Sequence, residues 1–229
     1  MNNLLSIFVS AALISLLLPS KVKAVGFLES DVASDVGNIV GNAGITSTQP
    51  SGTILDSISG SLTAIPTGSN NPDIDLYQFI ATGGNFSAST LGGTSIDTLL
   101  FLFDANGIGI VGSDNASVSS FQSIISGNLI PGQLYYIGVS SYGSNPQSSG
   151  GDIFNLPFTG QTTANGSGAG ASLASWSPNG VPEYGSYTIT LEGAQFIGNA
   201  EAVPFEFAPT FGLFILTLWV GWKLKKRKL

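Results

Sequence analysis

Residues 73–114 constrain the fold of this chain most strongly, because short apolar runs alternate there with glycine turns. Tyr77 and Phe79 share one face of the first run, since side chains two apart in a strand point to the same side. Residues 99–103 (LLFLF) are apolar on both faces, which indicates a central strand or one with something packed on its outer side. Asn106 and Gly107 are typical of a tight hairpin turn. The pattern predicts successive β-strands.

Similar runs follow along the rest of the chain, most clearly in residues 185–192 (GSYTITLE). The other expected strands are residues 57–63, 75–80, 86–90, 108–111, 121–126 and 134–141, with an edge strand at 38–40 in an N-terminal arm (residues 29–50). Short strands separated by glycine-rich turns predict an all-β sandwich or barrel. Residues 142–182 are far longer than an ordinary loop, and Ile153, Phe154 and Trp176 indicate that parts of this segment pack down.

Charge is distributed very unevenly. The cations are Lys21 and Lys23 near the start and five Lys or Arg residues at 223–228, whereas all 14 acids lie between Val25 and Trp222. The body of the protein is therefore purely anionic. Such a surface repels nucleic acid and anionic lipid, and a cation such as calcium is its natural counter-charge.

The same distribution restricts catalysis. The chain has no His or Cys, and its body has no Lys, which excludes Ser-His-Asp, Cys-His and Schiff-base chemistry and His-ligated zinc. We predict that the protein is not an enzyme. Paired carboxylates remain the one catalytic alternative, with Asp73/Asp75 and Asp97/Asp104 as candidates by residue type. Residues 107–112 match G-x-G-x-x-G, but a hairpin there is expected in place of a dinucleotide site.

Both ends of the chain carry membrane-directed segments. Residues 4–18 form an apolar core followed by Val22, Lys23 and Ala24, which predicts a signal peptide (residues 1–24) cleaved after Ala24; a retained anchor is the alternative. Residues 208–222 form a second apolar run, about 22 Å long as a helix, before the basic end. The basic cluster should stay cytoplasmic, which places the body outside.

Several segments resemble, in order, the bacterial pre-peptidase C-terminal (PPC-like) β-sandwich. The matching residues are 75–79 (DLYQF), 86–90 (FSAST), 97–107 (DTLLFLFDANG), 134–140 (LYYIGVS) and 185–191 (GSYTITL). The resemblance covers roughly residues 30–198. It implies a jelly-roll-like antiparallel sandwich of about eight strands, occupying residues 25–202, and a non-catalytic domain on secreted or exported proteins.

The C-terminal segment, residues 203–229, resembles PEP-CTERM sorting signals in its order of a short Pro-Glu motif, an apolar helix and a basic end. Phe205 intervenes in Val203-Pro204-Phe205-Glu206, which is similar to the Pro-Phe-Glu variant of the class. This resemblance implies an exosortase-type membrane protease as partner, in Gram-negative bacteria that make exopolysaccharide. A permanent single-span anchor explains the same segment, and membrane physics alone does not separate the two.

Oxygen-donor side chains at expected turns make calcium the one candidate cofactor. They are Asp73, Asp75, Asp104, Asn106 and Asp114, with Asn115 beside the last. Their spacing matches no EF-hand. Some sandwiches of the PPC-like family bind calcium at strand-end acids, which favours a site, and solvated turn acids are the alternative.

Tyr142, Trp176 and Tyr184 flank the long loop and could stack on sugar rings or simply cover the sandwich edge. We therefore predict an exported, non-enzymatic protein, first tethered to the inner membrane and then located at the cell surface or in the extracellular polysaccharide matrix. A calcium-dependent carbohydrate-binding module and a permanently anchored surface protein are the alternatives, and a carboxylate hydrolase is more remote.

Overall fold

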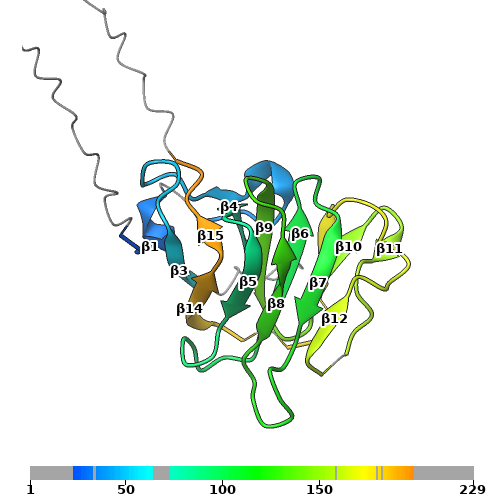
Figure 1. Cartoon of the computed structure of the whole chain (residues 1–229). Coiled ribbons are helices and arrows are strands. Elements are labelled where there is room, and N and C mark those ends of the chain that lie inside the picture. The colour runs from blue at the N-terminus through cyan, green and yellow to red at the C-terminus, as the bar shows by residue number, and fades with distance from the viewer. Residues whose placement is uncertain are drawn as a thin grey trace, which may run out of the picture.

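The computed structural model describes residues 23–32, 35–63, 73–157, 159–178, 180–181 and 183–198, where regular structure is almost entirely β-strand (Figure 1). The prediction of an all-β fold is confirmed. The hydrophobic part of the predicted signal peptide and the sorting residues 203–206 lie outside the described residues. Within the described ranges, no helix is both long and apolar enough to cross a membrane.

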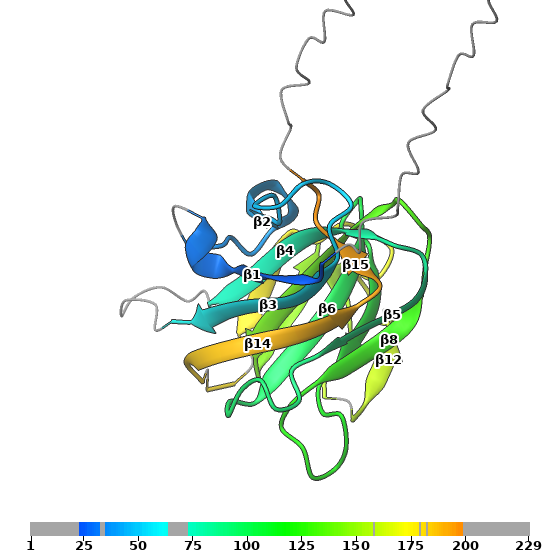
Figure 2. The same cartoon turned by 60° about the vertical axis from the view of Figure 1, so that its left-hand side comes forward.

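Two sheets form the body of the protein. The first contains, in spatial order, β1 (Val25–Leu28), β3 (Leu55–Leu62), β14 (Gly185–Glu192), β5 (Gly84–Ser89) and β8 (Ile124–Leu129) (Figure 2). The second contains β12 (Gln161–Thr163), β7 (Gly109–Ser113), β6 (Thr98–Asp104), β9 (Leu134–Ser141), β4 (Ile74–Ala81) and β15 (Ala194–Gln195), with β2 (Gly44–Ile45) also paired to β4.

The two sheets bury one large core between them. Strand alternation supplies it, since every second residue of β4, β6 and β9 faces the first sheet. Its aromatic members include Phe27, Tyr77, Phe79 and Tyr187. Phe79 stacks on Phe86 of β5 with ring centroids 5.2 Å apart, which joins the second sheet to the first.

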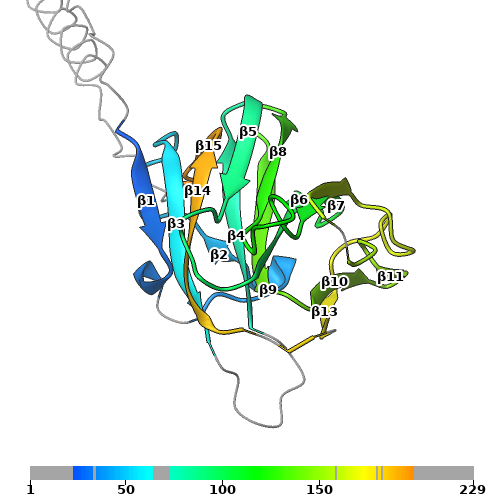
Figure 3. The same ribbon diagram turned by 90° about the horizontal axis from the view of Figure 1, so that it is seen from below.

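A second core covers the outer face of the second sheet. Phe101 and Phe103 of β6 pack there against Phe154 and Trp176 from the long loop. That loop forms a small sheet of β11 (Gly151–Asp152), β10 (Ser144–Ser148) and β13 (Ser175–Pro178), seen beside β6 and β7 in Figure 3. The LLFLF run is therefore apolar on both faces because it is central in its sheet and also covered by a further layer.

Some details of the strand prediction were wrong. The described residues contain fifteen strands, not about eight, because the long loop and the N-terminal arm contribute their own. The pairing is not wholly antiparallel, since β1 runs parallel to β3 and β2 parallel to β4. The expected edge strand at 38–40 is absent. Two 3-10 turns, Glu29–Asp31 and Val40–Asn42, shape the arm, and its strand pairing comes from Gly44 and Ile45.

Candidate metal centre

Asp75 is an acidic residue within a largely hydrophobic strand. It lies on β4 between Ile74 and Leu76, which face the outer core, so strand alternation turns its side chain toward the core between the sheets. Asp75 is fully buried. A carboxylate in such a place is costly unless it gains a proton, hydrogen bonds or a cation.

The hydrogen bonds of Asp75 satisfy only one of its two oxygens. The Tyr187 hydroxyl on β14 donates to Oδ2 at 2.5 Å, and the Tyr77 hydroxyl lies 2.6 Å from that of Tyr187. Oδ1 is buried and has no hydrogen-bond partner among the described residues. Burial raises the pKa of the Asp75 carboxyl to about 9, the bond from Tyr187 lowers it, and the charges of Glu29, Asp73 and Asp35 raise it further.

The N-terminal arm brings two more carboxylates to Asp75. Glu29 begins the 3-10 turn that follows β1, and Asp35 comes shortly after that turn. One oxygen from each of Glu29, Asp35 and Asp75 lies within 4.8 Å of the other two. Burial raises the pKa of Glu29, the bond from the Ser61 N–H lowers it, and the neighbouring Asp35 raises it. We call these three residues the arm site.

The backbone of β3 holds the arm site together. The Ser61 N–H donates to Glu29 Oε2 at 2.8 Å, which fixes the first carboxylate against the sheet. The neighbouring Gly60 leaves room for it, because a Cβ there would lie 2.6 Å from Glu29 Oε2 and closer still to the Tyr187 hydroxyl. A larger residue at this position would therefore displace the Glu29 carboxylate or the Tyr187 hydroxyl.

Asp73 lies at the border of the arm site. Its Oδ2 accepts hydrogen bonds from the Thr63 N–H and from the Thr63 hydroxyl, the latter at 2.9 Å. Burial raises the pKa of Asp73, the two bonds from Thr63 lower it, and the charge of Asp35 raises it. Four acids thus influence one another at one end of the sandwich, in a body whose sequence has no Lys, Arg or His between Val25 and Trp222.

The geometry of the arm site fits an oxygen-preferring cation. Calcium lies 2.3–2.6 Å from each ligand oxygen, so two oxygens on one ion are at most about 5 Å apart. The arm-site oxygens meet this limit, and the unpartnered Oδ1 of Asp75 supplies a free electron pair inside the protein. Carboxylate oxygens alone, with no His or Cys, favour calcium or magnesium over zinc or copper.

The remaining predicted ligands do not join this site. Asp104 ends β6, and its Oδ1 accepts the N–H groups of Asn106 and Ile108 at 2.8 and 2.9 Å, which closes the hairpin turn. Asp75 and Asp104 oppose Val139 and Tyr135 of β9, so they are separated by four positions, about 13 Å. Asp104 and the exposed Asn106 thus lie apart from Asp73 and Asp75, and Asp104 has the ordinary role of an acid that closes a turn.

Asp114 lies at a third place, just beyond β7. Ser113, Leu100, Val139 and Asp75 occupy one row across β7, β6, β9 and β4. Three strand spacings of about 4.8 Å therefore separate the Asp114 region from Asp75 by about 14 Å. Asp114 cannot share an ion with the arm site.

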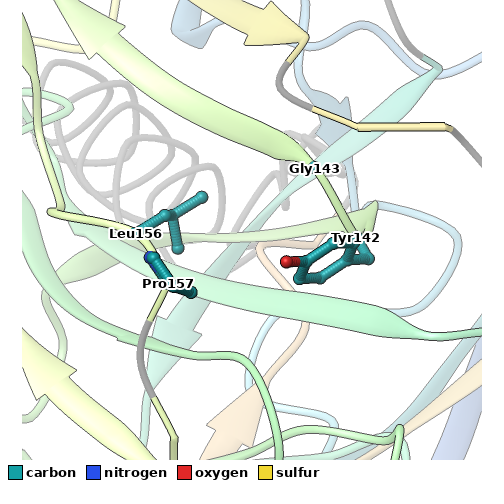
Figure 4. Close-up of a pocket in the computed structure, with 4 residues that line it drawn as sticks. All are labelled: Tyr142, Gly143, Leu156 and Pro157. Atoms are coloured by element: carbon teal, nitrogen blue, oxygen red, sulfur yellow. The ribbon is translucent and has the colours of Figure 1, made fainter.

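The aromatic residues that flank the long loop have different roles. Trp176 is buried against Phe101 and Phe103, and its indole N–H donates to the Asn38 carbonyl at 2.6 Å, so it covers the sheet. Tyr142 is 42% exposed and lines a pocket of about 360 Å³ with Gly143, Leu156 and Pro157. Its hydroxyl points across toward the last two residues (Figure 4).

The sequence did not point to Glu29 and Asp35 as site residues. Both belong to an arm with weak alternation, and no local pattern indicates that their carboxylates come close to Asp75. The one available signal was the density of acids in residues 29–35 (ESDVASD) of a body without cations.

The chain was also compared with known proteins. No model of a protein family matches it, and neither does any of the curated proteins with which it was compared.

Proposed function

We propose that this chain is an exported, non-enzymatic protein of the cell surface or extracellular matrix, whose β-domain binds calcium at Glu29, Asp35 and Asp75. The observation that carries the proposal is the convergence of three carboxylate oxygens within 4.8 Å in a body that contains no cationic side chain. Such a cluster needs protons or a metal ion to be stable. Calcium outside the cell is the counter-charge that fits oxygen ligands.

The bound ion has a structural role in this proposal. Glu29 and Asp35 belong to the arm, whereas Asp75 belongs to β4 of the second sheet. An ion between them fastens the arm over the end of the sandwich, next to the Tyr77–Tyr187 pair. Extracellular calcium modules commonly bind with dissociation constants of about 10⁻⁴–10⁻³ M, so the arm would be locked after export and loose before it.

The PPC-like, jelly-roll-like assignment is part of the proposal. It is supported by the path of the chain, which passes from β3 in the first sheet to β4 in the second, back to β5 and again to β6. It is also supported by the sequence segments that resemble the family. We propose no catalytic step, since the body lacks His, Lys and Cys.

Export is proposed from the two ends of the chain. β1 begins at Val25, immediately after the predicted cleavage site at Ala24, so a mature chain starting there would keep the whole strand. At the other end, we propose that Val203, Pro204, Phe205 and Glu206 mark a sorting segment for an exosortase-type protease. The apolar run behind them tethers the precursor to the inner membrane.

Two experiments test this function. Hydrogen exchange of the full-length protein should show slower exchange in residues 29–37 with calcium than with chelator, and equal exchange in both would contradict the arm site. Mass spectrometry of the protein from its native cells should give an N-terminus at Val25 and a C-terminus without the basic end. An intact basic tail would leave a permanent anchor instead.

A calcium-dependent carbohydrate-binding role is the second candidate. Tyr142 favours it, because this exposed ring borders the pocket with Leu156 and Pro157, and Tyr184 is also 47% exposed. Calorimetry with a panel of polysaccharides, each with calcium and with chelator, tests this role. Heat that appears only with calcium and disappears in Tyr142→Ala would support it, and no heat would leave the structural role.

A further inference from the structure

Unpartnered buried oxygens are concentrated at a second corner of the protein. Among the described residues, six buried side-chain polar atoms have no hydrogen-bond partner. Three of them are Oδ1 of Asp97, which precedes β6, and Oδ1 of Asp114 and Asn115, which follow β7. Buried polar atoms are nearly always paired, so three acceptors without donors in one corner indicate something that the protein alone does not supply. We call these three residues the β6–β7 corner.

The two carboxylates of this corner face the same side of the sheet. Thr98 points inward, where its hydroxyl lies 2.7 Å from that of Thr90, so the adjacent Asp97 points outward. A Cβ on Gly112 would meet Phe101 and Phe154 of the outer core, so Asp114, two residues later, also points outward. β6 and β7 are antiparallel neighbours, which brings the start of one to the end of the other.

The backbone around the corner is fixed by segments far apart in the sequence. The Asp97 carbonyl accepts the Tyr142 N–H at 2.9 Å, and its N–H donates to Glu183 Oε2 at 2.8 Å. The Asn115 carbonyl accepts the Gly160 N–H at 2.9 Å. The main chain of Asp97 and Asn115 is thus held in place, although nothing among the described residues donates to the three Oδ1 atoms. A fixed backbone beside unpartnered oxygens favours a ligand site.

The electrostatics of the corner are unfavourable without a cation. Asp114 is only 2% exposed. Burial raises the pKa of its carboxyl to about 6, and the charge of Asp97 raises it further. Burial also raises the pKa of Asp97, and the charge of Glu183 adds to this. No Lys, Arg or His exists between Val25 and Trp222 to neutralise these acids.

We infer that Asp97 and Asp114 bind a second divalent cation of the calcium class, independent of the arm site, at the corner that also holds the unpartnered oxygen of Asn115. Carboxylate oxygens are ligands that calcium prefers, and the absence of nitrogen and sulfur ligands disfavours zinc and copper. The ion would join the β6–β7 hairpin to the segments that hold it, at Tyr142, Gly160 and Glu183. It would thereby brace the long loop at the point where Tyr142 enters the pocket.

The two sites are separable by experiment because they lie on opposite faces of the second sheet. Asp75 faces the core between the sheets and Asp114 faces the outer layer, and their row positions are about 14 Å apart. Substitution of Asp by Asn keeps the shape of the side chain and removes its charge. Asp114→Asn and Asp75→Asn therefore each remove one site, and Glu192→Gln on the exposed side of β14 is the matched control.

The test is calcium stoichiometry by equilibrium dialysis of the full-length protein in detergent, after treatment with chelator. We expect Asp114→Asn to bind one calcium ion fewer than the unchanged protein, Asp75→Asn also one fewer, the double variant two fewer, and Glu192→Gln the same number. Asp97→Asn should reproduce the loss in Asp114→Asn and guards against a folding defect confined to one variant.

Equal calcium binding in Asp114→Asn, Asp97→Asn and the unchanged protein would overturn the second site, whatever Asp75→Asn does. Loss in Asp75→Asn alone would leave only the arm site. Loss in Asp114→Asn alone would support the second site and contradict the first. Dialysis against magnesium in place of calcium should give weaker binding at the corner, since magnesium demands a stricter octahedron of ligands.

Discussion

The arm site and the β6–β7 hairpin turn show two uses of the same residue type. Asp104 lies at the end of a strand, and one of its oxygens accepts two backbone N–H groups of its own turn. Asp75 lies inside a strand, where the backbone N–H groups already serve the sheet ladder, and one of its oxygens has no partner among the described residues. Asp104 finds its hydrogen-bond donors within its own turn. Asp75 depends on groups from distant parts of the chain, such as the Tyr187 hydroxyl.

Acid spacing in sequence therefore does not separate these two roles, whereas burial without donors marks a carboxylate that needs a proton or a cation. Asp104 needs no ion, because the turn neutralises it with N–H dipoles. Asp75 gains only the Tyr187 hydroxyl and is surrounded by further acids. The free energy of a bound cation should therefore appear at the arm site and not at the hairpin.

The largest effect is expected from pH in the absence of calcium. The pKa of Asp75 is about 9 in the folded protein, against about 4 in an unfolded chain, so the folded state holds the extra proton between these values. Its contribution to stability is complete below about pH 4 and is lost as pH rises toward 9, by up to about 1.4 kcal/mol per pH unit. The negative charges of Glu29, Asp73 and Asp35 also raise the pKa of Asp75.

Urea unfolding at several pH values between about 5 and 8, with chelator and with calcium, checks this slope. With chelator, the free energy of unfolding should fall as pH rises. With calcium the fall should be weaker, because the ion replaces the proton. Asp75→Asn should remove most of the pH dependence of the free energy of unfolding. An unchanged pH dependence in that variant would mean that other acids cause it.

Gly60→Val should have the next largest effect. The new side chain would collide with Glu29 Oε2 and the Tyr187 hydroxyl, so we expect the free energy of unfolding to fall by about 1–3 kcal/mol, with loss of the calcium response. Gly127→Val on β8 is the matched control, because a Cβ there meets nothing within 4 Å. Equal losses in the two variants would mean that the cost comes from the strand and not from the arm site.

Asp104→Ala should lower the free energy of unfolding by less than Gly60→Val does, and calcium should not change this loss. It removes two hydrogen bonds to turn N–H groups, worth about 1–2 kcal/mol together. The same loss should be measured by urea unfolding with calcium and with chelator. A loss that appears only with calcium would show that Asp104 is a ligand after all.

Glu192→Gln should have the smallest effect, within about 0.5 kcal/mol in either condition, because this side chain is exposed on β14. Thermal unfolding of this variant beside the unchanged protein measures it. A larger change would indicate that the overall negative charge of the body, and not the two buried clusters, governs the response to calcium.

The sequence predicted the fold class because strand alternation is a local signal. The LLFLF run correctly indicated either a central strand or an outer layer, and both hold for Phe101 and Phe103. The sequence did not predict the small sheet of β10, β11 and β13, because residues 144–152 (SNPQSSGGD) have little alternation. Their pairing depends on the packing of Ile153, Phe154 and Trp176 against β6.

The candidate site was less predictable than the fold. Asp73 and Asp75 were identified as possible ligands from residue type, but their partners Glu29 and Asp35 come from an arm whose course is set by tertiary contacts. One such contact is the bond from the Leu76 N–H to the Gly37 carbonyl, at 3.1 Å. Asp104 and Asp114 belong to the same β6–β7 hairpin, but Asp104 accepts two N–H groups and Asp114 has an unpartnered oxygen. The register of β6 and β7 places the two acids at different ends of the hairpin.

We propose that Asp75 is a ligand of a calcium ion that fastens the arm. The most direct test of this role is the thermal unfolding midpoint of the full-length protein and of Asp75→Asn, each with chelator and with calcium at about 100 times its dissociation constant. One site then contributes about 2.7 kcal/mol, or about 5–10 °C for a domain of this size. We predict that the calcium-dependent rise is smaller by that amount in Asp75→Asn, and an equal rise in both proteins would contradict the claim.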